Sequence, residues 1–265
     1  MKAHILQLDM LWEDKLGNRA KAGSLIQQTP VSPSDLVILP EMFDTGFSFH
    51  VKQTADNDGE TSRFLSATAA RHRIYLHGSR TALDRAGRAM NLASVYAPDG
   101  GAICEYEKVH PFGLGSPGER EADHFPGGAE VKTYDWSTPD GSTLRVCPVI
   151  CYDLRFPELF RKGLLLGAEV FIVTTNWPSV RAGHLRALLI ARAIENQAYV
   201  LCVNRTGRDP SMVYAGGSVA IDPKGEVVAE LSDAEACLTV EIDPAAVRDW
   251  RARFPAWRDH RLLTR

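Results

Sequence analysis

The chain has 265 residues, 45% of them hydrophobic and 24% charged, and its 30 basic and 33 acidic side chains give a formal net charge of −3. This near balance provides no basic surface for nucleic acid or for an anionic membrane, and we expect neither as a partner. No uncharged apolar run approaches the roughly 20 residues that a membrane helix needs. The five cysteines are odd in number and dispersed, unlike a secreted disulfide framework, which favours a reducing, cytoplasmic location.

The first half of the sequence alternates short apolar runs with longer segments of helical periodicity. In chain order, this pattern predicts strand, helix, strand, helix, strand and strand at residues 4–10, 16–28, 36–40, 60–72, 74–80 and 91–98. The turn Asp99-Gly100-Gly101 then indicates a hairpin into a further strand. Strands and helices are interleaved rather than segregated, so we expect an α/β fold.

A long irregular segment, residues 111–128, follows the hairpin and is rich in glycine, proline and charge. Loops of this length in compact domains are more often functional than incidental. The alternation then resumes, which favours one domain over two. The second half predicts strand, helix, strand, helix and then four strands at residues 144–150, 156–167, 170–176, 184–197, 199–205, 218–223, 226–231 and 237–243. A tail rich in tryptophan and arginine ends the chain.

The segment VCPVICYDLRFPE, residues 146–158, contains the first candidate catalytic residue. An apolar strand runs into Cys151, and we expect a helix to begin at Pro157 because proline is favoured in a first turn. The thiol then lies on a tight turn at a strand end, where backbone N–H groups can face an oxyanion. Cysteines within strands usually serve packing, the role we assign to Cys104, Cys147, Cys202 and Cys237. The spacing of Cys147 and Cys151 matches neither a redox pair nor a usual zinc half-site, so we expect no metal.

Two charged residues also follow predicted strands. Glu41, in LPEMFDTGF, could be a general base whose pKa is raised by partial burial. Lys108, in EYEKVHPF, closes the hairpin strand before the long loop. Either residue alone is typical of a solvated surface, since glutamate and lysine are mostly exposed. Their combination with Cys151 is what makes all three candidates for catalysis.

In this order and at these intervals, Glu41, Lys108 and Cys151 resemble the catalytic residues of the nitrilase, or carbon–nitrogen hydrolase, superfamily. The segments TNWP and ARAIENQAYVLCVNRTG, together with RFPAWRDH in the tail, are especially similar to the ω-amidase branch. The resemblance covers nearly the whole chain. It implies a single-domain, four-layer αββα sandwich that works as a homodimer without a cofactor. We assign residues 1–243 to the hydrolase domain and residues 244–265 to a tail that packs on the domain or on the dimer partner.

The resemblance also implies a second glutamate in the loop after the lysine. Counting back from the aromatic residue and glycine of EADHFPGG favours Glu121 for this role, with Glu119 as the alternative. Three further residues follow predicted strand ends and are expected to line a substrate pocket: Phe43, Asn176 and Trp177.

Arginines offer two hypotheses for substrate contact. Asp153, Arg155 and Glu158 can be interpreted as a substrate clamp, but we favour internal pairing of Arg155 that braces the turn, because arginine suits buried bidentate pairing. If the substrate carries a carboxylate, Arg155 and Arg205 are candidates to bind it.

The residue types fit amide hydrolysis with a small-molecule amide and water as reactants. Cys151 would attack the carbonyl, Glu41 would carry protons, and Lys108 with the N–H of Tyr152 would hold the oxyanion. The resemblance implies ω-amides of α-keto dicarboxylic acids, such as 2-oxoglutaramate and 2-oxosuccinamate, and a cysteinyl thioester. The alternatives are a nitrilase, an amidase for another small substrate, or a catalytically silent binding module. The resting protonation of Cys151 stays open, because Lys108 favours the thiolate and Glu41 opposes it.

Overall fold

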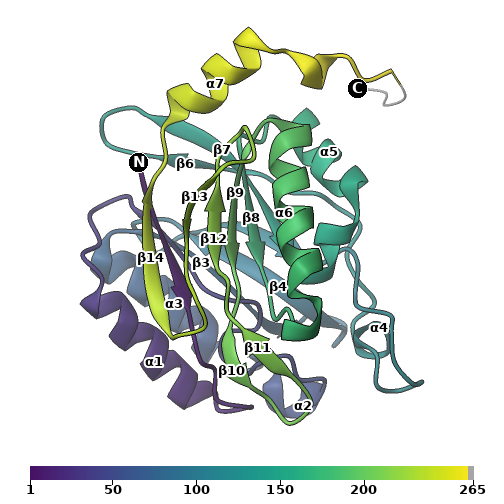
Figure 1. The fold of residues 1–265 in the computed structure, drawn as a ribbon. Coiled ribbons are helices and arrows are strands. Elements are labelled where there is room, and N and C mark those ends of the chain that lie inside the picture. The colour runs from purple at the N-terminus through teal and green to yellow at the C-terminus, as the bar shows by residue number, and fades with distance from the viewer. Residues whose placement is uncertain (262–265) are drawn as a thin grey trace.

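The computed structural model describes residues 1–261, in which the strands form two six-stranded sheets and one two-stranded ribbon (Figure 1). The first sheet has the order β14 (Ala236–Glu241), β1 (Lys2–Gln7), β2 (Leu36–Ile38), β3 (Tyr75–Leu83), β4 (Ala89–Tyr96), β5 (Ala102–Glu107). The second has the order β13 (Val227–Glu230), β12 (Val219–Ile221), β9 (Tyr199–Val203), β8 (Val170–Thr174), β7 (Thr143–Ile150), β6 (Tyr134–Ser137). The ribbon pairs β10 (Thr206–Arg208) with β11 (Val213–Ala215).

Each large sheet contains three parallel strands flanked by antiparallel ones. The parallel set is β1, β2 and β3 in the first sheet and β7, β8 and β9 in the second. The carboxyl ends of parallel strands meet at one edge of a sheet, where α/β folds usually place their sites. The chain leaves β2, β7 and β8 through the segments that contain Glu41, Cys151 and Asn176.

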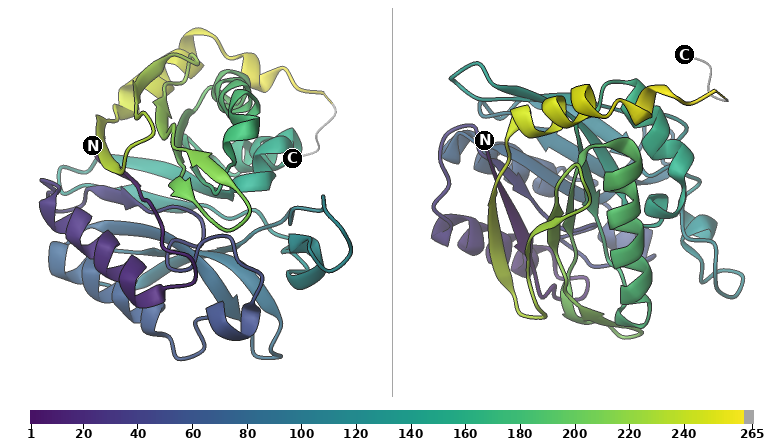
Figure 2. Two further views of the ribbon diagram at one scale, coloured as in Figure 1. Left: turned by 60° about the horizontal axis from the view of Figure 1, so that its bottom comes forward. Right: turned by 45° about the horizontal axis from the view of Figure 1, so that its top comes forward.

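Helices cover the outer face of each sheet, as Figure 2 shows. The helices α1 (Lys15–Gln28) and α3 (Glu60–His72) pack on the first sheet, and α5 (Pro157–Leu165) and α6 (Ala182–Asn196) pack on the second. A third apolar core lies between the sheets and includes Ile5 and Ile38 from one and Val146 and Ile172 from the other. The predicted αββα sandwich is therefore confirmed.

The alternation of strand residues explains this layering. On β7, Cys147 and Val149 belong to the core under the helices, whereas Leu144 and Val146 face the other sheet. Strand side chains point alternately to opposite faces, so a strand buried on both sides must be apolar throughout. The long predicted helices and strands are confirmed, with ends that shift by a few residues.

Several short elements were not predicted. They are β6, the ribbon β10–β11, and the one-turn helices α2 (Val51–Thr54) and α4 (Glu121–His124). The long segment 111–128, expected to be irregular, thus contains α4. Elements of three or four residues are too short for a periodic pattern to emerge.

The predicted tail contains α7 (Pro244–Arg253), capped by the Asp243 carboxylate, which accepts a 2.8 Å hydrogen bond from the N–H of Ala245. Val247 is buried in the core between the sheets, and the Arg251 guanidinium donates to the carbonyl of Ala168. Residues 262–265 of the tail lie outside the described residues. In the described part of the chain, no helix is both long enough and apolar enough to cross a membrane.

Candidate active site

Cys151 lies where β7 turns into α5, on a short 3₁₀ helix, Cys151–Arg155. Its φ of +46° is in the left-handed region, which a side chain with a Cβ rarely adopts. Such strain persists where the surroundings hold it, and it is common at functional sites. The predicted arrangement of strand, turn and helix, with α5 beginning at Pro157, is confirmed.

Asp153 holds this turn from inside. It is fully buried, and its Oδ2 accepts the N–H of Ile150 (3.2 Å) and the hydroxyl of Tyr106 (2.6 Å). Its Oδ1 accepts the backbone N–H of His110 at 2.8 Å and lies 2.8 Å from Nδ1 of the same residue. The idea that Asp153 clamps substrate is therefore wrong, since its oxygens tie the turn to the segment after β5. Glu158 is exposed on α5.

Glu41, Lys108 and Glu121 form a buried ionic cluster. The Lys108 Nζ donates to Glu41 Oε1 at 2.8 Å and to the two oxygens of Glu121 at 2.9 and 2.8 Å. None of the three is more than 1% exposed. Glu121 is the first residue of α4, and its Oε2 also accepts the N–H of Phe112 at 2.6 Å. The structure thus brings Glu121 to Lys108, whereas Glu119 is exposed.

Two asparagines complete the hydrogen bonding of the carboxylates. The Asn91 amide on β4 donates to Glu41 Oε1 at 2.8 Å and to Glu121 Oε1 at 3.0 Å. Asn176, after β8, donates its backbone N–H to Glu41 Oε2 at 2.9 Å and its side-chain amide to the Glu41 carbonyl at 2.7 Å. Asn91 was missed by the sequence analysis, because a single asparagine in a predicted strand gives no signal of its long-range partners.

Burial and neighbouring charges shift the pKa values of the cluster. Burial alone lowers the pKa of Lys108, but the carboxylates of Glu121 and Glu41 outweigh it and raise that pKa above its ordinary value. Burial raises the pKa of Glu121 despite the opposing effect of Lys108. Burial, then the nearby Glu41 carboxylate, raises the pKa of Cys151 well above its ordinary value, with Lys108 opposing. At neutral pH, Lys108 is therefore an ammonium ion and Cys151 a thiol.

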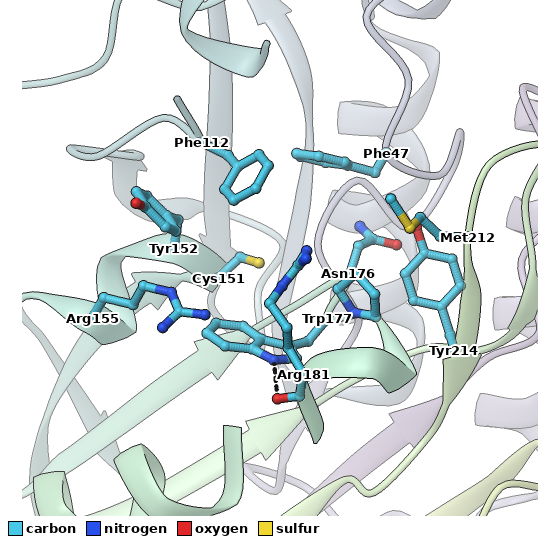
Figure 3. Close-up of a pocket in the computed structure, with 11 residues that line it drawn as sticks. Phe47, Phe112, Cys151, Tyr152, Arg155, Asn176, Trp177, Arg181, Met212 and Tyr214 are labelled. Carbon is cyan, nitrogen blue, oxygen red and sulfur yellow. Dashed lines mark hydrogen bonds between the residues drawn. The ribbon is translucent and has the colours of Figure 1, made fainter. Parts of the chain in front are cut away.

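Cys151 lies at a cavity whose empty space, including its open mouth, is about 490 Å³. Its walls, shown in Figure 3, consist mainly of aromatic side chains together with two arginines. The lining residues are Phe47, Phe112, Cys151, Tyr152, Arg155, Asn176, Trp177, Pro178, Arg181, Met212 and Tyr214.

Of the three residues expected to line the pocket, Asn176 and Trp177 do so, and Tyr152, whose N–H was expected to hold the oxyanion, lines it as well. The expectation for Phe43 is corrected. Its side chain is fully buried in the core under α1 and α3, with its ring 6.1 Å from that of Phe64. Phe47, four residues later, lines the cavity in its place.

The arginine predictions are also corrected. Arg155 is not paired with any acidic side chain among residues 1–261; its guanidinium lies 4.8 Å from the Trp177 ring and 5.8 Å from the Tyr152 ring, at the cavity. Arg205 is fully buried, and its guanidinium donates to the backbone carbonyls of Met10 (2.9 Å), Arg208 (3.1 Å) and Thr206 (3.1 Å). Arg205 is therefore a structural residue and does not line the cavity. Arg181, which does, was missed.

The described residues contain no group of three or more His, Cys, Asp and Glu side chains arranged to hold a metal ion. The chemistry that the site can perform without one is that of a thiol nucleophile beside a carboxylate and an ammonium ion. The carboxylates and the ammonium are buried and are not among the residues that line the cavity, whereas Cys151 is.

Comparison with known proteins agrees with this arrangement. The family model described as carbon-nitrogen hydrolase matches residues 2–252. The chain is 34% identical to the omega-amidase YafV of Yersinia enterocolitica over 98% of its length and 96% of that protein. It is 33% identical to the 2-oxoglutaramate amidase of Bacillus subtilis, over 97% of this chain and 96% of that one. Among solved structures, the chain is similar to XC1258 from Xanthomonas campestris, a CN-hydrolase superfamily protein with an arsenic adduct in its active site. The TM-score is 0.89 and the sequence identity 33%, and the match covers 100% of this chain and 98% of that one.

Proposed function

The chain belongs to the carbon–nitrogen hydrolase family and hydrolyses amides, and from this premise we propose that it releases ammonia from small ω-amides of α-keto dicarboxylic acids through a cysteinyl thioester. The observation that carries the proposal is the buried Glu41–Lys108–Glu121 cluster placed behind the thiol of Cys151. Relatives named as omega-amidase and 2-oxoglutaramate amidase support this substrate class, with 2-oxoglutaramate and 2-oxosuccinamate as examples.

Glu41 is the proton carrier in this mechanism. Because the pKa of Cys151 is raised, the nucleophile rests as a thiol and needs a base when it attacks. Glu41 Oε1 accepts from Lys108 and Asn91, both at 2.8 Å, whereas Oε2 has one short donor, the N–H of Asn176 at 2.9 Å. Oε2 therefore keeps a lone pair for the thiol proton.

Acylation then proceeds through a tetrahedral intermediate. The sulfur of Cys151 bonds to the amide carbon while the carbonyl electron pair moves to oxygen, where the Lys108 ammonium and the N–H of Tyr152 stabilise the negative charge. The intermediate collapses by breaking the carbon–nitrogen bond, and the proton held by Glu41 goes to the departing nitrogen as ammonia forms. A thioester remains on Cys151.

Deacylation repeats the same steps with water. Glu41 takes a proton from the water that attacks the thioester carbon, the oxyanion is held as before, and the thiolate of Cys151 leaves and is reprotonated by Glu41. Glu121 holds the Lys108 ammonium from its other side, at 2.8 and 2.9 Å, and so keeps it charged and directed throughout.

A substrate panel tests the proposal. Ammonia release is measured with 2-oxoglutaramate, with a nitrile of matched length and with an N-carbamoyl compound. We expect the highest kcat/KM for 2-oxoglutaramate. Faster turnover of the nitrile would favour a nitrilase, and absence of turnover on every compound, with a folded protein, would favour a silent binding module.

We also propose that the protein is a cytoplasmic homodimer with one catalytic unit in residues 1–243. The five free cysteines suit a reducing compartment, and the family resemblance implies the dimer. Light scattering coupled to size-exclusion chromatography tests the dimer; a mass of one chain, 29.2 kDa, at micromolar concentration would contradict it.

A further inference from the structure

The charged side chains that line the cavity in front of Cys151 are all positive. Two of its lining residues are arginines, Arg155 and Arg181, and none of the lining residues is acidic. The remaining walls are largely aromatic, so a short aliphatic chain can pack there while a charged end finds a cation. This combination fits a small anion rather than a neutral amide.

The backbone of Arg181 is held by hydrogen bonds, whereas its guanidinium group extends into the cavity. It ends the 3₁₀ helix Ser179–Arg181, its N–H donates to the Pro178 carbonyl at 3.0 Å, and its carbonyl accepts the indole N–H of Trp177 at 2.8 Å. Figure 3 shows the side chain rising from this helix into the space that Cys151 and Phe112 border, and its guanidinium lies 5.4 Å from the Phe112 ring. The position is therefore pre-organised, and no residue among 1–261 accepts a hydrogen bond from the Arg181 guanidinium.

Arg181 differs in its partners from nine arginines whose guanidinium groups pair with acidic side chains. In the described part of the chain, arginines lie within 4.0 Å of acidic side chains at positions 19, 80, 88, 120, 145, 186, 192, 205 and 248. Arg181 is half-buried and has no such partner within residues 1–261. Its planar fork of donors matches a carboxylate in a bidentate manner.

Arg155 lacks a carboxylate partner as well, but its surroundings differ. Its guanidinium contacts two aromatic rings, those of Trp177 (4.8 Å) and Tyr152 (5.8 Å), whereas that of Arg181 contacts one, that of Phe112 (5.4 Å). Figure 3 shows it to the side of Cys151, next to the indole of Trp177. Arg155 thus contributes positive potential to the cavity from a fixed place.

We propose that Arg181 is the residue that binds the substrate carboxylate and makes the enzyme selective for amides whose far end is anionic. The inference rests on the proposed function, because it assumes that the amide end lies at Cys151. The substrate then spans the cavity from the thiol to the guanidinium, with its chain against Phe47 and Phe112. The substrate class is the monoamides of short dicarboxylic acids.

The kinetic test compares succinamate with butyramide, which has a methyl group where succinamate has a carboxylate. In Arg181→Gln, we expect the ratio of kcat/KM for succinamate over butyramide to fall roughly 100-fold, mostly through KM, because a charge-assisted pair is lost. Arg181→Lys should restore part of the ratio. An unchanged ratio in Arg181→Gln would overturn the proposal.

Two matched variants separate a direct contact from general electrostatics. Arg155→Gln removes the same charge from the same cavity, and we expect it to lower the ratio by less than about 10-fold, since screened charges at a distance act weakly. Arg186→Gln removes the same charge from the surface pair with Glu230 and should leave the ratio unchanged. An effect of Arg155→Gln larger than that of Arg181→Gln would assign the carboxylate to Arg155 instead.

A binding measurement keeps the inference separate from catalysis. Calorimetry with glutarate on the Cys151→Ala protein should give binding that Arg181→Gln in the same background weakens by roughly 100-fold. If this holds while the wild-type protein hydrolyses no amide, the proposed function fails, and only the binding of a carboxylate by Arg181 stands. If amides are hydrolysed but glutarate does not bind, or binds both proteins equally, the inference fails and the proposed function stands. Thermal unfolding confirms that each variant is folded.

Discussion

The buried ionic cluster and the cavity in front of it differ in how their charged side chains are paired. In the cluster, Lys108 has two carboxylate partners at 2.8 to 2.9 Å, and every member is almost completely buried. In the cavity, Arg155 and Arg181 are half-buried and have no carboxylate partner among residues 1–261. A fully paired charge keeps its place and its protonation state, as catalysis requires, whereas an unpaired one is available to a ligand.

The largest effect is expected from removal of the thiol that joins the two regions. Cys151→Ala should lower ammonia release by about 10⁴-fold or more, because the covalent route is lost. Its free energy of unfolding should change little. Alanine has a Cβ like cysteine, so the backbone strain at φ +46° is the same in both proteins. Activity assays and urea unfolding measure the two quantities. The control is Cys147→Ala, which truncates a buried cysteine four residues earlier, on β7. Substantial activity in Cys151→Ala would refute the site.

A charge removed from the cluster should act on the chemical step. Glu121→Gln should reduce kcat by roughly 10²-fold, because Lys108 loses a partner in a site where oxyanion stabilisation counts for most. Without the Glu121 carboxylate, burial lowers the pKa of Lys108, so the alkaline limb of the kcat profile should move to lower pH. Glu119→Gln is the matched control, since that residue is exposed in the same loop. A profile that does not move in Glu121→Gln would contradict the coupling.

Loss of the Asp153 carboxylate, which holds the turn at Cys151, should affect both the alkylation rate of Cys151 and the stability of the protein. Asp153→Asn places an amide against the N–H of Ile150 or of His110, so we expect the free energy of unfolding to fall by roughly 2–4 kcal/mol. The rate of Cys151 alkylation by iodoacetamide should also fall, because the sulfur is no longer held at the cavity. Glu158→Gln, on the exposed side of α5, should change neither. Full retention of stability and alkylation rate in Asp153→Asn would remove Asp153 from this role.

The smallest effect concerns a buried carboxylate outside the cluster. Asp44 is fully buried, and burial raises its pKa to about 6, with the 2.7 Å hydrogen bond from Thr61 opposing. Because the folded pKa lies above the unfolded value of 3.8, the stability from the protonated form is present at low pH and is lost as the pH rises through about 6. Asp44→Asn should therefore reduce the pH dependence of the unfolding free energy between about pH 4 and about pH 7 by roughly 1–3 kcal/mol.

Chemical unfolding across this pH range measures the effect, and Asp249→Asn, on the exposed face of α7, is its control. An equal pH dependence in Asp44→Asn and the wild-type protein would show that Asp44 is ionised at all these pH values, as a carboxylate with an ammonium partner would be.

The sequence was sufficient wherever the signal was local. The strand that ends at Cys151 and the proline that begins α5 are neighbours in the chain, so the turn could be inferred from one segment. Glu41 and Lys108 required the family resemblance, because the contact between them joins positions 67 residues apart. Glu121 required the structure for its distinction from Glu119, since only the path of the loop decides which side chain turns inward.

The wrong predictions have two physical causes, a local backbone turn and a long-range contact. Phe43 follows a strand, but the chain turns at Met42, which has a φ of +44°, and this turn sends the Phe43 side chain toward α3. Arg205 donates to the carbonyl of Met10, 195 positions away, a contact that no local pattern contains. Which cations are paired inside the protein and which remain free for a ligand is decided by such long-range contacts.

The central claim is that Cys151 carries the acyl group during turnover. Protein quenched with acid while it hydrolyses 2-oxoglutaramate can be weighed intact and then mapped by peptide. We expect a mass increase equal to the mass of the substrate minus that of ammonia, located on the peptide that contains Cys151 and absent from Cys151→Ala. The same adduct on another residue would contradict it, as would turnover without any adduct when deacylation is shown to limit the rate.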